Sequence, residues 1–222
     1  MDMLGAGLVL ASLAAALVYG LMLVGRPSSL MRTLVKTAAV GLLALMAYAV
    51  GGPWLLIAAL ALSALGDAFM ADPDRFLPPG LVSFLLAHVL YVVLFARTGD
   101  AALAAEPARA AAIAATVVVA LLLLRWLWPG LGKMRPAVIA YVLAIGAMVT
   151  TSFLLPAAMW PAMVGAVLFM GSDAVLAGEL FRGAKLGGSQ RATDWAVWFA
   201  YYGGQALIAY AFLAACCSRQ VM

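Results

Sequence analysis

Charged residues are scarce in this sequence: 10% of the 222 residues are Asp, Glu, Lys or Arg, whereas 67% are hydrophobic. A soluble domain has about 25% charged and about 45–50% apolar residues, and it needs polar surface to stay in water. The apolar excess also excludes intrinsic disorder, which requires low hydrophobicity. The composition therefore predicts an integral membrane protein.

Residues that bind metals or form disulfides are also scarce. The chain has a single histidine and two cysteines, the neighbours Cys216 and Cys217. Vicinal cysteines rarely bridge each other, and one histidine with two distant cysteines does not make a metal site. The sequence therefore indicates no metal and no cofactor, and we interpret the cysteines as small apolar residues near a helix end.

Long apolar runs make up most of the chain. They are continuous and rich in Ala and Leu, which favours helices over the alternating segments of a β-barrel. Because a spanning helix needs roughly 20 residues, about eight helices would fit. We predict an all-α polytopic membrane bundle of about eight transmembrane helices, forming one integral membrane domain over residues 1–222. The expected helices cover residues 4–23, 33–50, 54–71, 81–96, 108–128, 136–154, 161–181 and 194–216.

Basic residues are distributed unevenly between these helices. Ten Lys and Arg residues follow the odd-numbered helices, and three lie in the other loops or at the termini. The positive-inside rule then places the odd-numbered loops in the cytoplasm and both termini outside. We therefore interpret the net charge of +4 as basic loops of a cell (inner) membrane protein, with the bilayer and no nucleic acid as its partner.

Two short segments suggest an internal repeat. Asp67-Ala68 and Asp173-Ala174 each follow a small residue, and an Arg/Phe pair comes eight and nine residues after each Asp. The same offset of 106 residues aligns the basic loops that follow the first and fifth helices. A parallel four-plus-four duplication would explain this pattern, and chance agreement over so few residues is the alternative.

Few ionisable side chains interrupt the apolar helices, and each one is costly in a membrane, so each is a functional candidate. At a rise of 1.5 Å per residue, Asp67 and Asp173 reach a similar depth in two parallel helices. Four other polar side chains fall in the same, cytoplasmic half, Lys36, His88, Tyr201 and Gln205, and Tyr91 is a further candidate on the helix of His88. We predict one polar pocket that opens toward the cytoplasmic leaflet; Tyr141 is polar too but is not assigned to it.

Each candidate also has a purely structural interpretation. The aspartates could form ion pairs inside the bundle, and His88 or the tyrosines could hydrogen-bond between helices. Lys36, expected in the first turn of its helix, could simply extend its ammonium group to the membrane surface. Helical spacing places His88 with Tyr91 on one face and Tyr201 with Gln205 on another, while Tyr202 points about 100° away.

Short motifs that contain these residues follow one another along the chain. They are Leu65-Gly66-Asp67 with Phe69; Arg75-Phe76 through Gly80-Leu81 with Phe84, His88 and Tyr91; Ser172-Asp173 with Phe181; and Tyr201-Tyr202 with Gln205. Their order and spacing resemble the YhhN-like lysoplasmalogenase family of multi-pass membrane enzymes. Lys36 matches a lysine typical of that family, although Thr37 stands where Pro is expected.

The resemblance, which runs from about Lys36 to Ile208, implies an eight-helix ether hydrolase that cleaves the vinyl-ether bond. Its substrate would be a lysoplasmalogen, a lysophospholipid with one alkenyl ether chain. Its products would be a fatty aldehyde and glycerophosphoethanolamine or glycerophosphocholine. The resemblance also implies that Asp67 and Asp173 are the catalytic pair.

The chemistry of a vinyl ether suits two carboxyl groups. Protonation of the carbon β to oxygen gives an oxocarbenium ion, water adds, and the hemiacetal collapses. One buried, protonated Asp could act as the acid, while an ionised Asp stabilises the cation and activates water, as in glycosidases. His88 and Tyr91 would support a carboxylate or the water, and Lys36 with Arg32 would hold the lipid phosphate. The sequence leaves open which Asp is the acid.

Two other classes of membrane protein also use intramembrane aspartates. Intramembrane aspartyl proteases typically show Tyr-Asp and Gly-x-Gly-Asp, but Gly66 and Ser172 precede the aspartates here and position 64 is Ala. A transporter of protons or small solutes could use the Asp, His and Lys residues as a relay. A pocket closed on the outer side and open laterally to lipid would favour the hydrolase over the transporter.

Overall fold

The computed structural model describes residues 3–219, apart from the side chains of residues 73–74 and 217–219. This part of the chain contains eight α-helices and no strand, which confirms the all-α class. The helices are α1 (Met3–Val18), α2 (Leu30–Ala49), α3 (Trp54–Phe69), α4 (Pro73–Thr98), α5 (Pro107–Leu127), α6 (Arg135–Ser152), α7 (Trp160–Arg182) and α8 (Gln190–Arg219). A π-helical turn, Tyr19–Leu23, continues α1.

Seven helical segments among the described residues are long and apolar enough to cross a membrane. The exception is α3, whose 16 residues would extend about 24 Å, less than the roughly 30 Å hydrocarbon core. The molecule is therefore a multi-pass membrane protein with seven candidate spans. The expected number of about eight differs from this by α3, which packs between α2 and α4.

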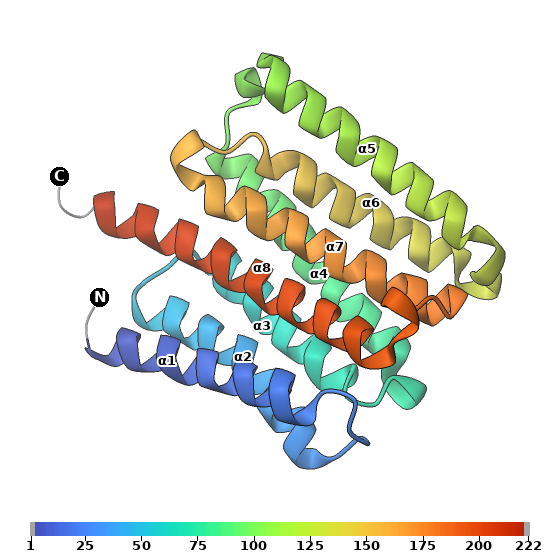
Figure 1. Ribbon diagram of the computed structural model, residues 1–222. Helices are drawn as coiled ribbons and strands as arrows, with labels where there is room; N and C mark the ends of the chain where they lie inside the picture. The colour runs from blue at the N-terminus through green and yellow to red at the C-terminus, as the bar shows by residue number, and fades with distance from the viewer. Residues whose placement is uncertain (1–2, 220–222) are drawn as a thin grey trace.

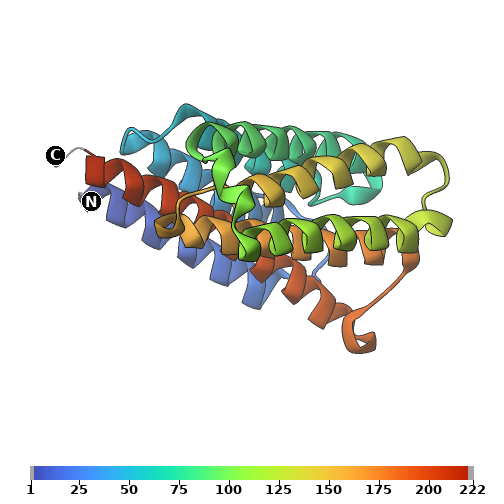
Figure 2. The same ribbon diagram turned by 90° about the horizontal axis from the view of Figure 1, so that it is seen from above.

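The helices run antiparallel in chain order. Figure 1 shows both ends of the chain at one end of the bundle and the connections α1–α2, α5–α6 and α7–α8 at the other. Figure 2 again places the termini opposite the α5–α6 connection. Between the two halves of the chain, α4 packs on α6 and α2 packs on α8. A parallel four-plus-four repeat would make α2 equivalent to α6 and α4 equivalent to α8, so each of these two contacts is the equivalent of the other. The arrangement is compatible with that prediction without establishing it.

Three helices begin three or more residues earlier than the sequence predicts: α2, α4 and α8, the last at Gln190 instead of residue 194. The Ser29 side chain caps α2 by accepting a hydrogen bond from the Arg32 backbone N–H, so Lys36 lies in the second turn rather than the first. In α4, expected from residue 81, Pro78 and Pro79 follow a break at Phe76 and therefore stand in the first turn of a new helical stretch. Prolines are tolerated there because the first turn does not need their missing N–H groups.

Glycines bring the site-bearing helices close together. A Cβ atom on Gly66 would lie 2.8 Å from the Phe84 ring, so the residue before Asp67 lets α3 approach α4. A Cβ atom on Gly165 would lie 2.6 Å from the carbonyl oxygen of Gly204, where the backbones of α7 and α8 meet. Both contacts fix the depth at which the polar side chains of neighbouring helices face each other.

Candidate active site

A polar cavity of about 380 Å³ lies at the end of the bundle that carries the odd-numbered loops. We call it the polar cavity. Asp67 of α3 and Asp173 of α7 both line it, together with Arg32 and Lys36 of α2. Loop residue Arg26 and helix-end residues Glu179, Gln190 and Asp194 also line it, and we call the part of the cavity beside them its mouth. The prediction that two intramembrane aspartates share one pocket therefore agrees with the geometry.

Asp67 is fully enclosed by partners from two other helices. Its side chain is 1% exposed, and its Oδ1 atom lies 3.3 Å from the ammonium nitrogen of Lys36. The Tyr201 hydroxyl donates a hydrogen bond of 2.7 Å to Oδ2. A buried charge is tolerated when it is both paired and hydrogen-bonded, so this environment suits an ionised carboxylate.

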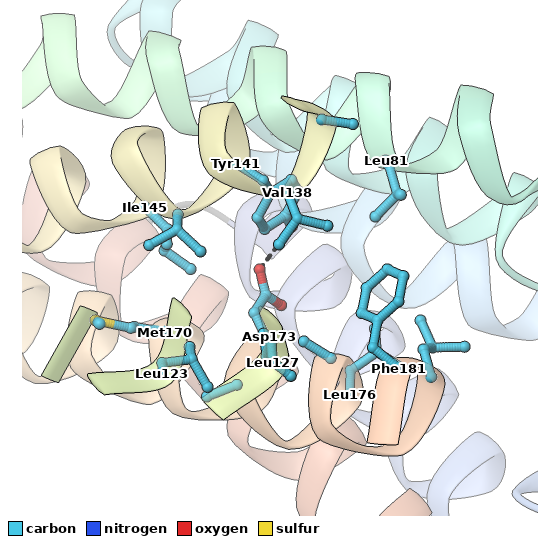
Figure 3. A pocket seen from close by; sticks show the side chains of 15 residues that line it. Leu81, Leu123, Leu127, Val138, Tyr141, Ile145, Met170, Asp173, Leu176 and Phe181 are labelled. Atoms are coloured by element: carbon cyan, nitrogen blue, oxygen red, sulfur yellow. Dashed lines mark hydrogen bonds between the residues drawn. The ribbon is translucent and has the colours of Figure 1, made fainter. Parts of the chain in front are cut away.

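Asp173 has a different environment. Its Oδ2 atom accepts a hydrogen bond of 2.6 Å from the Tyr141 hydroxyl, the contact drawn in Figure 3. The second neighbour of Oδ2 is His88, whose Nε2 atom is 3.6 Å away. Within the described part of the chain, no Lys or Arg forms an ion pair with Asp173. The two carboxyl groups thus differ in the charge that faces them.

The orientation of His88 bears on the proton of Asp173. Its Nδ1 atom lies 2.7 Å from the carbonyl oxygen of Phe84, and a carbonyl can only accept a hydrogen bond. Nδ1 must therefore carry a proton, and in a neutral ring Nε2 presents a lone pair to Asp173. Nε2 is buried and has no hydrogen-bond partner among the described residues. A protonated carboxyl group on Asp173 could supply that partner.

The partners of the two aspartates come from corresponding helices of the two halves. Each has one partner on the preceding helix, Lys36 on α2 for Asp67 and Tyr141 on α6 for Asp173. Each has a second partner on the last helix of the other half, Tyr201 on α8 or His88 on α4. A parallel repeat predicts that each aspartate contacts the last helix of the other half, although the partner residues differ chemically.

The cations of α2 are held in place at the polar cavity. The Tyr19 ring, in the π-helical turn, lies 5.9 Å from the Arg32 guanidinium carbon and 6.0 Å from the Lys36 nitrogen. The Nη1 group of Arg32 also donates to the carbonyl oxygen of Ala71. Lys36 consequently faces Asp67 instead of extending to the membrane surface.

Tyr91 and Gln205 lie apart from the aspartates. The Tyr91 hydroxyl donates to the side-chain carbonyl of Gln205, whose NH₂ group donates to Ser63 at 2.9 Å. This chain joins α4, α8 and α3, and neither Tyr91 nor Gln205 lines the polar cavity. Of the predicted site residues, Lys36, Asp67 and Tyr201 form one group, His88 and Asp173 form another, and Tyr91 with Gln205 form a third.

Sequence reasoning did not assign Tyr141 or Tyr19 to the site. Tyr141 was recognisable as a polar residue in a membrane helix, but its depth alone does not show that it faces Asp173. Tyr19 gives no signal of its own, because a tyrosine near a helix end is common in membrane proteins. Among the described residues, no three His, Cys, Asp or Glu side chains are placed to hold a metal ion.

Comparison with known proteins gives an independent view of the chain. The model of the YhhN family matches residues 31–212. Proteins named Lysoplasmalogenase from Mycobacterium bovis and Mycobacterium tuberculosis are each 37% identical to it over 163 residues. The match covers 71% of this chain and 59% of each relative, so the chain spans about three fifths of the length of those relatives. No solved structure shows significant similarity to the chain.

Proposed function

Because this chain belongs to the YhhN family, we propose that it hydrolyses the vinyl-ether bond of lysoplasmalogens to a fatty aldehyde and a glycerophospho-alcohol. The name of its relatives gives the substrate class. The observation that carries the assignment to this chain is its pair of unlike carboxyl groups. Asp67, paired with Lys36, and Asp173, which faces Tyr141 and His88, line the same cavity.

Asp173 is the proton donor in this proposal. It gives its proton to the carbon β to the ether oxygen, and the double-bond electrons form the new C–H bond. The product is an oxocarbenium ion beside a carboxylate that is now negative. Tyr141 donates a hydrogen bond to that carboxylate, which stabilises the charge as it develops.

Asp67 is the base. Kept ionised by Lys36, it removes a proton from the water that attacks the oxocarbenium carbon. When the hemiacetal collapses, Asp67 returns this proton to the departing alcohol oxygen, and the hemiacetal hydroxyl proton restores Asp173. The cycle consumes one water and regenerates both carboxyl groups.

The other candidate residues take supporting roles. Lys36 and Tyr201 hold Asp67, and His88 orients Asp173. Tyr91 and Gln205 fix α4, α8 and α3 behind the aspartates. Since Lys36 is engaged with Asp67, Arg32 and Arg26 are the better candidates for the lipid phosphate.

The lysophospholipid would reach the site from the bilayer. We place the mouth of the polar cavity at the cytoplasmic leaflet and both termini outside, because the basic loops share the end of the bundle where the cavity lies. Toward the other end lies a separate cavity of about 220 Å³, lined by Leu94, Arg97 and Phe212 among others. Its lining has no residue in common with that of the polar cavity. Two cavities without a shared lining residue favour an enzyme over a transporter, which needs access to one site from both sides.

Aldehyde release tests the proposal directly. The purified protein is given lysoplasmenylethanolamine or its saturated-ether analogue, and wild type is compared with Asp67→Asn and Asp173→Asn. We expect aldehyde from the vinyl ether alone, and a loss of at least 10²–10⁴-fold in each variant, the usual contribution of one acid–base group. Folding is checked by thermal unfolding in detergent. If folded wild type releases no aldehyde, the hydrolase assignment fails and solute flux in liposomes becomes the next measurement.

A further inference from the structure

A second, apolar cavity adjoins the polar one. It lies between α6 and α7, with α5 and α4 contributing the remaining walls, and we call it the apolar slot. It is narrow, with a volume of about 50 Å³, so a long alkyl chain can enter only when the side chains that line it move apart. Of its described lining residues, the two with polar side chains are Tyr141 and Asp173, and the others are hydrophobic.

Asp173 stands where the two cavities meet. The residues common to both linings are Leu81, Tyr141, Asp173, Leu176 and Leu180. Figure 3 shows Asp173 with Ile145 and Met170 on one side and Leu81, Leu176 and Phe181 on the other. A ligand that occupied both cavities would therefore pass the carboxyl group at the point where its polar part ends.

The slot can receive a chain from the membrane. Its lining runs along α7 from Met170 to Phe181, a length of about 16 Å at 1.5 Å per residue. Ala137 and Leu180, near one end, are exposed, whereas Ile145 is 2% exposed at the other. Helix α5, which forms one wall, is the least buried of the candidate spans.

We propose that the apolar slot binds the alkenyl chain of the substrate while the polar cavity holds the glycerophospho group. This rests on the proposed function and extends it. A lysoplasmalogen changes from hydrocarbon to polar headgroup at its vinyl ether, and this molecule changes from an apolar to a polar lining at Asp173. Binding across the two cavities therefore places the reactive carbon beside the proton donor.

The slot acts on rate more than on affinity. Outside the protein the chain would lie in a bilayer that is as apolar as the slot, so burial in the slot gains little binding energy. Its effect is to hold the double bond in one position, and a misplacement of about 1 Å can cost about 100-fold in rate. Blocking the slot is thus expected to lower kcat for long-chain substrates.

Bulky substitutions of slot residues on α6 and α7 test this. Ala177→Phe and Val142→Phe fill the slot, and Ala140→Phe is the matched control because Ala140 is exposed on α6 outside the slot lining. We expect at least one slot variant to lose about 100-fold in kcat with an octadecenyl substrate. The same variant should lose less than about threefold with a butenyl substrate, whose short chain leaves the blocked part of the slot empty. Equal losses with both substrates in each folded slot variant would overturn the proposal.

Photo-crosslinking separates this inference from the proposed function and needs only the wild-type protein. The probe is a saturated-ether lysophospholipid with a diazirine at the end of its chain, which lacks the reactive double bond. We expect labelling of slot residues such as Leu123, Leu127 or Ala177. Labelling confined to residues outside the slot would overturn the chain site, even if the vinyl ether is hydrolysed. Slot labelling in a protein that hydrolyses no vinyl ether would support the chain site and contradict the proposed function.

Discussion

At the scale of single residues, the contact between Lys36 and Asp67 decides the character of the site. The Asp67 side chain is 1% exposed and the Lys36 side chain 15%, so water does little to stabilise either charge. Each group depends on the other, and losing one partner of a buried ion pair typically costs about 3–5 kcal/mol.

We predict that Lys36→Met lowers the free energy of unfolding by about 3–5 kcal/mol and abolishes aldehyde release, because Asp67 can then remain buried only by taking up a proton. The double variant Lys36→Met with Asp67→Asn removes both charges and should recover most of the lost stability, but no activity. Unfolding midpoints in detergent, measured for both single variants and the double variant, give the coupling energy. Losses that simply add would show that the two residues do not interact.

The sequence identifies most of the candidate site residues, but it does not show which of them contact each other. Asp67, Asp173, Lys36 and His88 are conspicuous because charged or ionisable side chains are expensive in apolar helices. That Lys36 faces Asp67 depends on how α2 packs against α3, which no local pattern specifies. The same is true of Tyr141, whose contact with Asp173 follows from the packing of α6 on α7.

At the scale of helices, close contacts between backbones set the depth of the site. Gly165 and Gly204 face each other, and a Cβ atom on Gly165 would also lie 2.9 Å from Ile208. Gly171, six residues later in α7, has open space where its Cβ atom would be. Helix α7 therefore contains one glycine that has no room for a larger side chain and one that does.

We predict that Gly165→Ala destabilises the protein by about 1–3 kcal/mol, because the new methyl group pushes α7 away from α8. Gly171→Ala is the matched control and should be neutral or stabilising by up to about 1 kcal/mol, since Ala favours the helix. Thermal unfolding in detergent compares the two variants. Equal stabilities would mean that α7 and α8 do not meet at Gly165.

Helix existence was predictable, whereas helix boundaries were less so. The apolar runs identify all eight helices, because each is separated from the next by Pro, Gly or charged residues. The starts of α2 and α4 differ from expectation since Ser29 caps α2 three residues early and Pro78 with Pro79 fit inside a first turn. The sequence predicts a helix over residues 54–71, whereas α3 ends at Phe69 and has 16 residues, too few for a candidate span.

At the scale of the whole molecule, the two halves of the chain exchange contacts across the site. Helix α8 supplies Tyr201 to the aspartate of the first half, and α4 supplies His88 to the aspartate of the second. An ancestral repeat would have given two similar carboxyl sites. In this chain Lys36 stands beside one and Tyr141 beside the other, and that difference separates a base from an acid in the proposed mechanism.

The orientation of the whole bundle is open to a direct test. The polar cavity lies at the end that carries the basic loops, and the positive-inside rule places that end in the cytoplasm. Ala102, in the α4–α5 connection, and Leu186, in the α7–α8 connection, are both exposed and lie at opposite ends. Single cysteines at these positions, with Cys216 and Cys217 replaced by Ala, would report which end faces outward.

We predict that a membrane-impermeant thiol reagent labels Ala102→Cys from the outer face of the membrane that holds the protein. Leu186→Cys should stay unlabelled until that membrane is opened, because its loop lies on the side where Lys and Arg are retained. Complete labelling of both after lysis is the control for accessibility. The reverse pattern would turn the cavity toward the outside, so that its mouth, with Arg26 and Arg32, would draw substrate from the outer leaflet of the same membrane.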